Sequence, residues 1–159
     1  MSINKFQLQK SEEVTFSESG IDPRGMITRT DKRGKIMFAS KAFRKMSVFD
    51  KEELMGMSHN IVRHPLMPKS VFKDMWSTVR KGRTWRGPVI NRRKDGKYYW
   101  ADIEISPIDK DGNIVRDNGK IEGYIAIRKE LSELDKEKAY KKYMQLKEKE
   151  YQEMISKKI

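Results

Sequence analysis

The sequence predicts an α+β domain of about a hundred residues, with short helices packed on one face of a five-stranded antiparallel sheet. Strand-like runs occur in two blocks, two runs before a central helical block and three runs after it. Short connections join the runs within each block, which favours antiparallel pairing. Between the blocks, one amphipathic helix has a single broad apolar stripe and needs a sheet face to cover.

The first block is a β-hairpin. Residues 26–31 are rich in β-branched side chains, residues 35–39 form a second short strand, and Lys32-Arg33-Gly34 supplies the turn. Residues 1–24 are polar and mixed in charge, so we expect a loose N-terminal cap there. The predicted division is therefore a cap over 1–24, a folded domain over 25–129 and a C-terminal helix over 130–159.

The central block contains three predicted helices. Residues 41–46 and 50–55 are short, and the second begins with Asp50 as N-cap and Glu53 three residues later. The third covers 69–81, with Pro68 before it and Gly82 as its stop. Its apolar stripe consists of Val71, Phe72, Met75, Trp76 and Val79. We expect this helix to cover the sheet and to leave a pocket between the two layers.

The second block is a run of three strands. Residues 84–93 and 97–108 are joined by Asp95-Gly96, a strong hairpin signal, and residues 120–129 follow a polar turn region. After Lys129 the chain has no Gly or Pro and many strong helix formers, which predicts a helix of up to about thirty residues. This helix is either a solvated tail or an element that docks on a partner or a second copy.

Composition limits the function. The chain has 159 residues, a formal net charge of +12 and no cysteine, which excludes disulfides, thiol nucleophiles and Cys-ligated metals. No signal peptide or membrane-spanning run occurs, so we expect a cytoplasmic protein. The basic excess is concentrated in residues 63–97, which contain 11 basic side chains and only two acidic ones. Such a patch is typical of phosphate binding, but no nucleic-acid recognition module accompanies it, and we expect no nucleic-acid partner.

Several motifs resemble one known family. Residues 59–68 read HNIVRHPLMP, residues 91–96 read NRRKDG and residues 123–128 read GYIAIR, with Trp76 and Trp85 at intermediate positions. These motifs resemble, in order from about Thr28 to Arg128, the PAS domain of bacterial aerotaxis receptors (Aer type). The resemblance implies the PAS fold, which agrees with the α+β architecture derived from the residue patterns.

The resemblance also implies a function. Such PAS domains are not enzymes; they hold FAD noncovalently between sheet and helices and report redox state and oxygen for aerotaxis. Because the sequence shows no transducer region, it is most similar to the stand-alone PAS subunit of a bipartite energy-taxis system (CetB type). The implied partner is a membrane-bound methyl-accepting-type transducer, which would bring the protein to the inner face of the cell membrane. A homodimer is also expected.

Site residues transfer position by position. In the family's Arg-His-Pro-Asp-Met-Pro motif, Arg63 and His64 are retained, whereas Leu66 replaces the Asp. Ser40 replaces an Asn common in the family. The expected cofactor-binding residues are Ser40, Asn60, Arg63, His64, Phe72, Trp76, Trp85 and Asn91, with no metal site.

The chemistry of these side chains suits a flavin. Phe72 and Trp76 share a helix face and can form an apolar wall, and Asn91 can both donate and accept at the edge of a ring. Arg63 presents a planar fork to phosphate oxygens. We expect a change of redox state to pass through residues 120–128 into the terminal helix.

Three alternatives remain open at this stage. Haem is the main rival cofactor, with His59 or His64 as axial ligand. A cofactor-free interaction module is the second, and Leu66 and Ser40 favour it. The third alternative is a purely structural role, in packing or in bracing loops, for Phe72, Trp76, Trp85, His59 and His64. The absence of cysteine excludes a flavin photoreceptor that forms a cysteinyl adduct.

Overall fold

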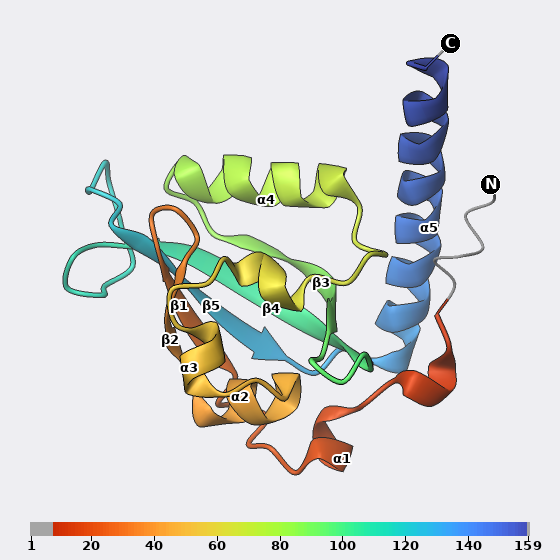
Figure 1. Cartoon of the computed structure of the whole chain (residues 1–159). Coiled ribbons are helices and arrows are strands. Elements are labelled where there is room, and N and C mark those ends of the chain that lie inside the picture. Colours follow the sequence, from red (N-terminus) through yellow and green to blue (C-terminus); the bar gives the residue numbers. More distant parts are fainter. Residues whose placement is uncertain (1–7, 159) are drawn as a thin grey trace.

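The computed structural model describes residues 8–158, which form a five-stranded antiparallel sheet in the order β2-β1-β5-β4-β3 (Figure 1). The strands are β1 (Ile27–Asp31), β2 (Ile36–Ala39), β3 (Trp85–Arg92), β4 (Tyr98–Ile108) and β5 (Gly123–Lys129). The two hairpins predicted from the turn residues, β1–β2 and β3–β4, are both present. β5 lies between them and joins them into one sheet.

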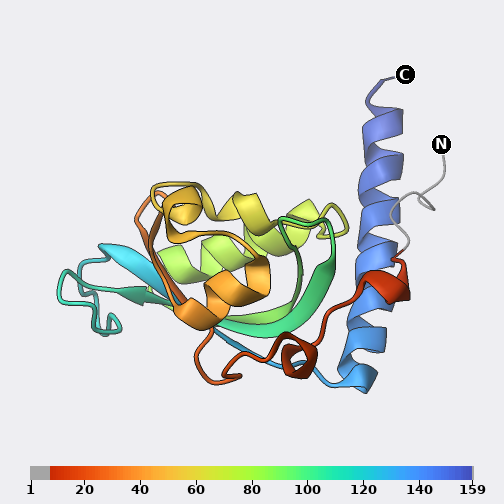
Figure 2. The same ribbon diagram turned by 60° about the horizontal axis from the view of Figure 1, so that its bottom comes forward.

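Helices cover one face of this sheet. In both ribbon views, α2, α3 and α4 lie on the same side of the strands, and α5 stands at the edge of the sheet (Figures 1 and 2). The helices are α1 (Phe16–Ser19), α2 (Lys41–Ser47), α3 (Lys51–Leu54), α4 (Lys69–Arg80) and α5 (Glu133–Ser156), with 3-10 turns η2 (Lys10–Glu12) and η3 (His59–Val62). The predicted fold class is confirmed. α1, η2 and η3 were not predicted, because each is a single turn without an apolar period.

The main core lies between the sheet and α2–α4. Met26, Ile36, Phe43, Met46 and Leu54 are fully buried there. Burying large apolar side chains contributes about 1.5–3 kcal/mol each, so this layer supplies much of the driving force for folding. No helix within residues 8–158 is both long enough and apolar enough to cross a lipid bilayer.

The N-terminal segment is not loose over residues 8–24. The Val14 amide donates to the Tyr98 carbonyl (2.8 Å), and Phe16 is buried. Glu13 forms an ion pair with Lys136 of α5, with 2.7 Å between Oε2 and Nζ. These partners lie far away in the sequence, so local composition could not reveal them. The rest of the predicted cap, residues 1–7, lies outside the described residues.

α5 docks on its own domain. Tyr143 donates its hydroxyl to the Pro88 carbonyl of β3 and stacks on Trp100 of β4, with the ring centroids 6.3 Å apart. Leu131 and Ala139 are buried beside them. The expectation of a solvated tail is therefore wrong for this part of the helix, whereas docking of α5 on a partner stays a prediction. Its C-terminal turns project beyond the sheet (Figure 1).

Near its C-terminal end, α5 also holds the start of α4. The Glu150 carboxylate accepts hydrogen bonds from the Lys69 and Ser70 amides, both at 3.1 Å. A carboxylate at this position satisfies free N–H groups and complements the helix dipole. α4, the helix with the predicted apolar stripe, is thus tied to the terminal helix.

Removing this contact should loosen both helices. We expect Glu150→Ala to cost about 1 kcal/mol of unfolding free energy and to speed amide exchange at the start of α4 and in the last turns of α5. Hydrogen-exchange mass spectrometry measures this. Glu148→Ala is the matched control, since the Glu148 carboxylate accepts a hydrogen bond from Gln152 of the same helix (2.9 Å). Equal exchange in both variants would contradict the clamp.

Candidate ligand cavity

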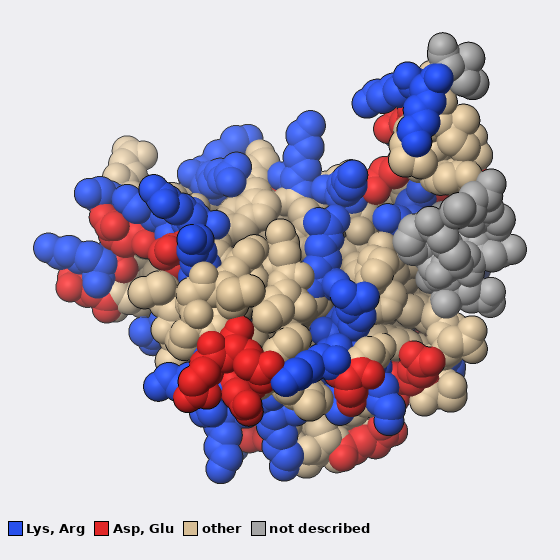
Figure 3. Space-filling model, in the orientation of Figure 1, with Lys and Arg blue, Asp and Glu red and all other residues tan. Residues whose placement is uncertain are grey.

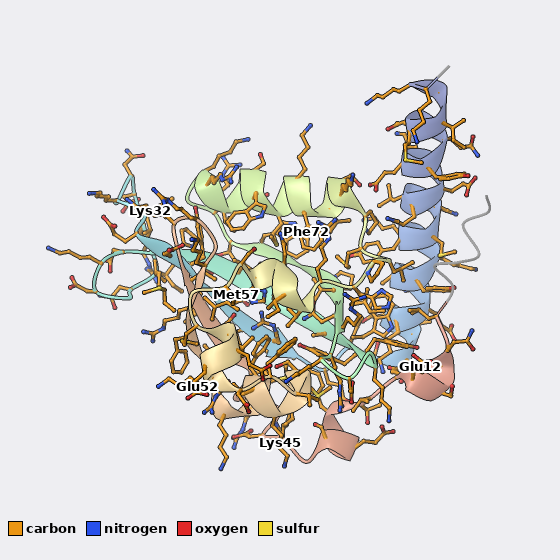
Figure 4. All side chains as sticks on the ribbon, viewed as in Figure 1. Glu12, Lys32, Lys45, Glu52, Met57 and Phe72 are labelled. Atoms are coloured by element: carbon orange, nitrogen blue, oxygen red, sulfur yellow. The ribbon has the colours of Figure 1, made fainter. Side chains whose placement is uncertain are left out.

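A cavity lies between α4, η3 and the inner face of the sheet. Figure 4 shows Phe72 of α4 on the side of the helix that faces the strands. Apolar side chains dominate the lining, and polar side chains occur near η3 and on β1 and β5. The lining residues are Thr28, Thr30, His59, Asn60, Val62, Arg63, Phe72, Met75, Trp76, Val79, Val89, Asn91, Ile103, Ile105, Tyr124, Ala126 and Arg128.

One wall of the cavity is the predicted stripe of α4. Phe72, Met75, Trp76 and Val79 follow the helical period and all line the cavity. Trp76 meets Tyr124 of β5 edge to face, with the ring centroids 5.4 Å apart. A Cβ atom added to Gly34 would lie 3.2 Å from the Trp76 ring. The indole therefore reaches from α4 to both the β1–β2 turn and the sheet.

Arg63 and Asn91 lie at the end of the cavity near η3. An antiparallel bridge pairs the two residues, and the Arg63 guanidinium lies 4.2 Å above the centre of the Phe72 ring. Asn91 is buried, and its Nδ2 donates to the Tyr99 hydroxyl (3.2 Å). Among residues 8–158, no carboxylate forms an ion pair with Arg63. A charged fork and an amide therefore lie beside an aromatic wall.

The β1–β5 side of the cavity contains a buried polar cluster. Arg128 is fully buried; its Nη1 donates to Thr28 Oγ1 (3.1 Å) and its Nη2 lies 2.9 Å from His59 Nε2. Burial and the nearby guanidinium lower the pKa of His59 to about 3, so the imidazole is neutral and accepts this hydrogen bond. Burial also lowers the pKa of Arg128, to about 10, which leaves it charged at neutral pH.

Sequence reasoning missed Arg128 as a site residue, although a signal was present. Inward-facing positions alternate along β5, and Tyr124, Ala126 and Arg128 are buried at every second position. A basic residue in the inward register of a central strand rarely occurs without a partner inside. Thr28 and Thr30 of β1 carry the same signal, because they too occupy alternate positions on a paired strand.

Five of the eight predicted site residues line this cavity. They are Asn60, Arg63, Phe72, Trp76 and Asn91. Asn60 is exposed in η3, and Arg63 follows that turn as its C-cap. Phe72 and Trp76 belong to α4, and Asn91 belongs to β3. The predicted juxtaposition of an aromatic pair with an amide and a guanidinium is therefore present.

The other three predicted residues lie outside the cavity. Ser40 caps α2, where its hydroxyl accepts from the Ile27 and Phe43 amides and donates to the Gly25 carbonyl. His64 accepts the Leu66 amide at Nδ1 (3.0 Å). Trp85 donates its indole N–H to Asp74 (2.9 Å). The Ser40 hydroxyl, His64 Nδ1 and the Trp85 indole N–H therefore hold the protein chain outside the cavity.

The family's missing aspartate also has a structural outcome. Leu66, which replaces it, is fully buried in the main core and does not line the cavity. The replacement therefore puts an apolar core side chain where the family has a polar one. Arg63 and Asn91 still supply polar groups to the cavity lining.

The basic excess in 63–97 is mostly on the surface. Figure 3 shows Lys and Arg side chains along the α4 edge of this face and acidic side chains gathered lower down. Several of the basic residues pair locally: Arg86 with Glu104, Arg93 with Asp95 and Lys94 with Glu53. Of the 11, only Arg63 lines the cavity. The proposed contact between this segment and cofactor phosphates therefore rests on Arg63.

The cavity as it stands is small. Its volume is about 80 Å³, below the roughly 300–1,000 Å³ of typical small-molecule pockets. The donor set suits a planar aromatic ligand, with apolar walls and hydrogen-bonding groups at two ends. Lining side chains would have to move for a three-ring system to enter.

The fold and this cavity define a class of protein: an α+β domain with a cavity between a five-stranded sheet and its covering helices. Residues 36–121 match the sequence profile described as the PAS fold. The chain belongs to the PAS family. It is 41% identical to the aerotaxis receptor of Escherichia coli K12 over 107 residues, which is 67% of this chain and 20% of the receptor.

A second relative is the nitrogen fixation regulatory protein of Klebsiella oxytoca. The identity is 29% over 106 residues, covering 67% of this chain and 20% of the regulator. The chain thus spans about a fifth of the length of these curated relatives. By their names, the first relative is a receptor and the second is a regulatory protein.

Solved structures agree on the fold. The LOV domain of the Erythrobacter litoralis EL346 blue-light-activated histidine kinase aligns with a TM-score of 0.59 at 14% identity, over 70% of this chain and 99% of that one. A PAS domain from Colwellia psychrerythraea aligns with a TM-score of 0.56 at 23% identity, over 66% of this chain and 84% of that one. At these identities the likeness concerns the fold alone.

Proposed function

We propose that this chain is a non-enzymatic redox and oxygen sensor module that binds FAD in the cavity. In this proposal it relays redox state to a membrane-bound chemotaxis transducer, at the cytoplasmic side of the membrane. The observation that carries the proposal is the cavity itself: Phe72 and Trp76 form an aromatic wall next to Arg63 and Asn91. The sequence resemblance to aerotaxis-receptor PAS domains, which implies FAD, supports the same ligand.

The residues divide the work by their chemistry. FAD, when bound, supplies reversible uptake of electrons and protons. Trp76 and Phe72 would hold its ring through apolar contact, and Asn91 would bind the polar edge of the ring. Arg63, free of any carboxylate partner in the described chain, would bind a phosphate group.

Two connections lead from the cavity to α5, which supports a relay. β5 contributes Arg128 to the cavity, and α5 begins at Glu133, shortly after that strand ends. α4 contributes Trp76 at the opposite wall, and Glu150 of α5 holds the N-terminus of α4. A displacement of either wall would therefore shift the terminal helix. The predicted path through β5 gains a second branch through α4.

The test is flavin binding by the purified protein. We expect the wild type to take up one FAD per chain, with absorption bands near roughly 370 and 450 nm. Trp76→Ala and Arg63→Ala should each weaken binding by about tenfold or more, because they remove an aromatic wall and a charged hydrogen-bond donor. Fluorescence titration measures the affinity. Arg83→Ala, at an exposed position outside the cavity, is the matched control and should bind as the wild type does.

A cofactor-free interaction module is the second candidate, and the cavity volume of about 80 Å³ favours it. Met37 and Phe38 of β2 and Ile127 of β5 are also exposed apolar side chains. A wild-type protein that binds no FAD and resembles all three variants in titration would support this candidate and contradict the flavin proposal.

Haem receives less support from the geometry. His59 Nε2 already accepts hydrogen bonds from Arg128 and Thr28, and His64 lies outside the cavity. Neither imidazole is therefore aimed into the cavity as a free axial ligand. A single intense Soret band after reconstitution with haem would contradict this assignment.

A further inference from the structure

The least ordinary group in the molecule is the Arg128 side chain. It is a fully buried cation, and within residues 8–158 no carboxylate lies close enough to form an ion pair with it. Burying a charge without an opposite charge is costly, and native proteins nearly always supply a partner. The partners that the chain offers are all neutral.

These neutral partners satisfy only part of the guanidinium. Nη1 donates to Thr28 Oγ1 and, at 3.4 Å, to the Ala126 carbonyl, and Nη2 donates to neutral His59. The Phe43 ring lies 4.6 Å from the guanidinium carbon. Arg128 Nε, by contrast, is buried without any hydrogen-bond partner. The chain therefore fixes the position of the guanidinium, but it supplies no acceptor for the Nε donor and no opposite charge for the cation.

A second unpaired polar atom lies on the neighbouring strand. Thr30 Oγ1 is buried without a partner, and both Thr30 and Arg128 line the cavity. β1 and β5 are paired, with Thr28 opposite Ala126 and Thr30 opposite Tyr124, so Thr30 lies along the sheet from Arg128 with Thr28 and Ala126 between them. Buried polar atoms without partners are few in native proteins and call for an explanation. A ligand with hydrogen-bond acceptors at two separate points would satisfy both atoms.

We propose that Arg128 and Thr30 form a subsite that binds hydrogen-bond acceptors at two separate points of the ligand, and that Arg128 is the counter-charge for negative charge on the bound cofactor. This inference rests on the proposed flavin function and deepens it. Two-electron reduction with uptake of one proton gives the flavin ring one more negative charge than the oxidised ring carries. Two-electron reduction with uptake of two protons adds no net charge to the ring. A buried cation beside the ring favours the first outcome and binds the reduced cofactor more tightly than the oxidised one.

The experiment measures the midpoint potential of the bound flavin by reductive titration, with dithionite as the electron donor and a reference dye. Arg128→Gln removes the charge and keeps a polar side chain. We expect it to weaken binding of the reduced cofactor by about tenfold to a hundredfold relative to the oxidised cofactor. Since a tenfold change corresponds to about 30 mV for a two-electron couple, the potential should fall by about 30–60 mV.

Three further variants make the result specific. Arg128→Lys keeps the charge and should keep most of the wild-type potential. Arg92→Gln removes one charge at an exposed position of β3 outside the cavity and should leave the potential unchanged. Thr30→Val removes the unpaired hydroxyl: it should lower the potential slightly, while the ligand-free protein stays as stable in urea as the wild type. The Thr30 variant keeps the test available if Arg128→Gln does not fold.

The outcomes separate this inference from the function on which it rests. A wild type without flavin overturns both. A wild type that binds flavin, together with Arg128→Gln and Thr30→Val proteins whose potentials equal that of the wild type, overturns only the subsite. A potential that falls equally in Arg92→Gln and Arg128→Gln would also overturn it, because a distant charge would then have the same effect.

Discussion

Replacing Gly123 with alanine is expected to destabilise the domain by about 3 kcal/mol or more. An added Cβ at this position would lie 2.2 Å from the Thr30 carbonyl oxygen, far inside the contact distance. The obstacle is backbone of the paired strand, so no side-chain rotation can relieve it. Gly123 pairs with Asp31 of β1 on one side and with Ile108 of β4 on the other, which fixes it in the middle of the sheet. Overpacking in a rigid setting costs roughly 1–3 kcal/mol or more.

Urea unfolding followed by tryptophan fluorescence measures this change. Gly25→Ala is the matched control, since the nearest atom to a Cβ there is 3.5 Å away, an ordinary contact. Its unfolding free energy should stay within about 1 kcal/mol of the wild type. A Gly123→Ala protein with the wild-type urea midpoint would show that the pairing of β1 with β5 differs from the one described. Because Thr30 belongs to this strand pair, the cavity would then also have a different lining.

The sequence predicts those parts of the fold whose signals are local. Asp95-Gly96 predicts the β3–β4 hairpin because its turn type is encoded by two adjacent residues. The stripe of α4 predicts both the helix and the side that faces the sheet. The anchoring of residues 8–24 could not be predicted in this way, since Val14 and Glu13 find their partners at Tyr98 and Lys136.

The candidate site shows the same division. Trp76 and Phe72 follow from the helical period, and Arg63 and Asn91 from the resemblance to aerotaxis-receptor PAS domains. Arg128 and Thr28 are bonded to each other across 100 residues of sequence, and only the sheet order brings them together. Ser40 and His64 were placed by analogy, but their polar atoms are used by nearby backbone groups. A resemblance to a family identifies candidate positions, but the hydrogen bonds of each side chain in the folded protein determine whether its polar atoms are available to a ligand.

The LOV domain of the Erythrobacter litoralis histidine kinase shares the architecture of this chain. With no cysteine anywhere in its 159 residues, an adduct between a thiol and a flavin cannot form. The polar groups that line this cavity are two amides, two guanidiniums, an imidazole and hydroxyls. In the proposed function these groups would bind and tune a cofactor through hydrogen bonds and charge.

The second large effect is a loss of stability in mild acid. Burial lowers the pKa of His59 to about 3, with a further contribution from Arg128, and lowers that of His64 to about 4. In the unfolded chain both imidazoles titrate near 6.5. As the pH falls from 8 to 5, the unfolded state therefore binds two protons that the folded state does not bind. Each imidazole then lowers the unfolding free energy by about 2 kcal/mol, or about 4 kcal/mol together.

Two near-isosteric variants assign the effect. Gln at position 59 can accept at the place of Nε2, where Arg128 donates, and Asn at position 64 can accept the Leu66 amide at the place of Nδ1. His59→Gln and His64→Asn should each remove about half of the pH dependence between pH 8 and 5 in urea unfolding. The pKa values of Glu53 and Glu133 are lowered from an ordinary value near 4.5, below this window, so these carboxyl groups add little to the loss above pH 5. Unfolding free energies that agree within about 0.5 kcal/mol at pH 8 and pH 5 would show that the imidazoles protonate freely in the folded protein, and the neutral acceptor beside Arg128 would be lost with them.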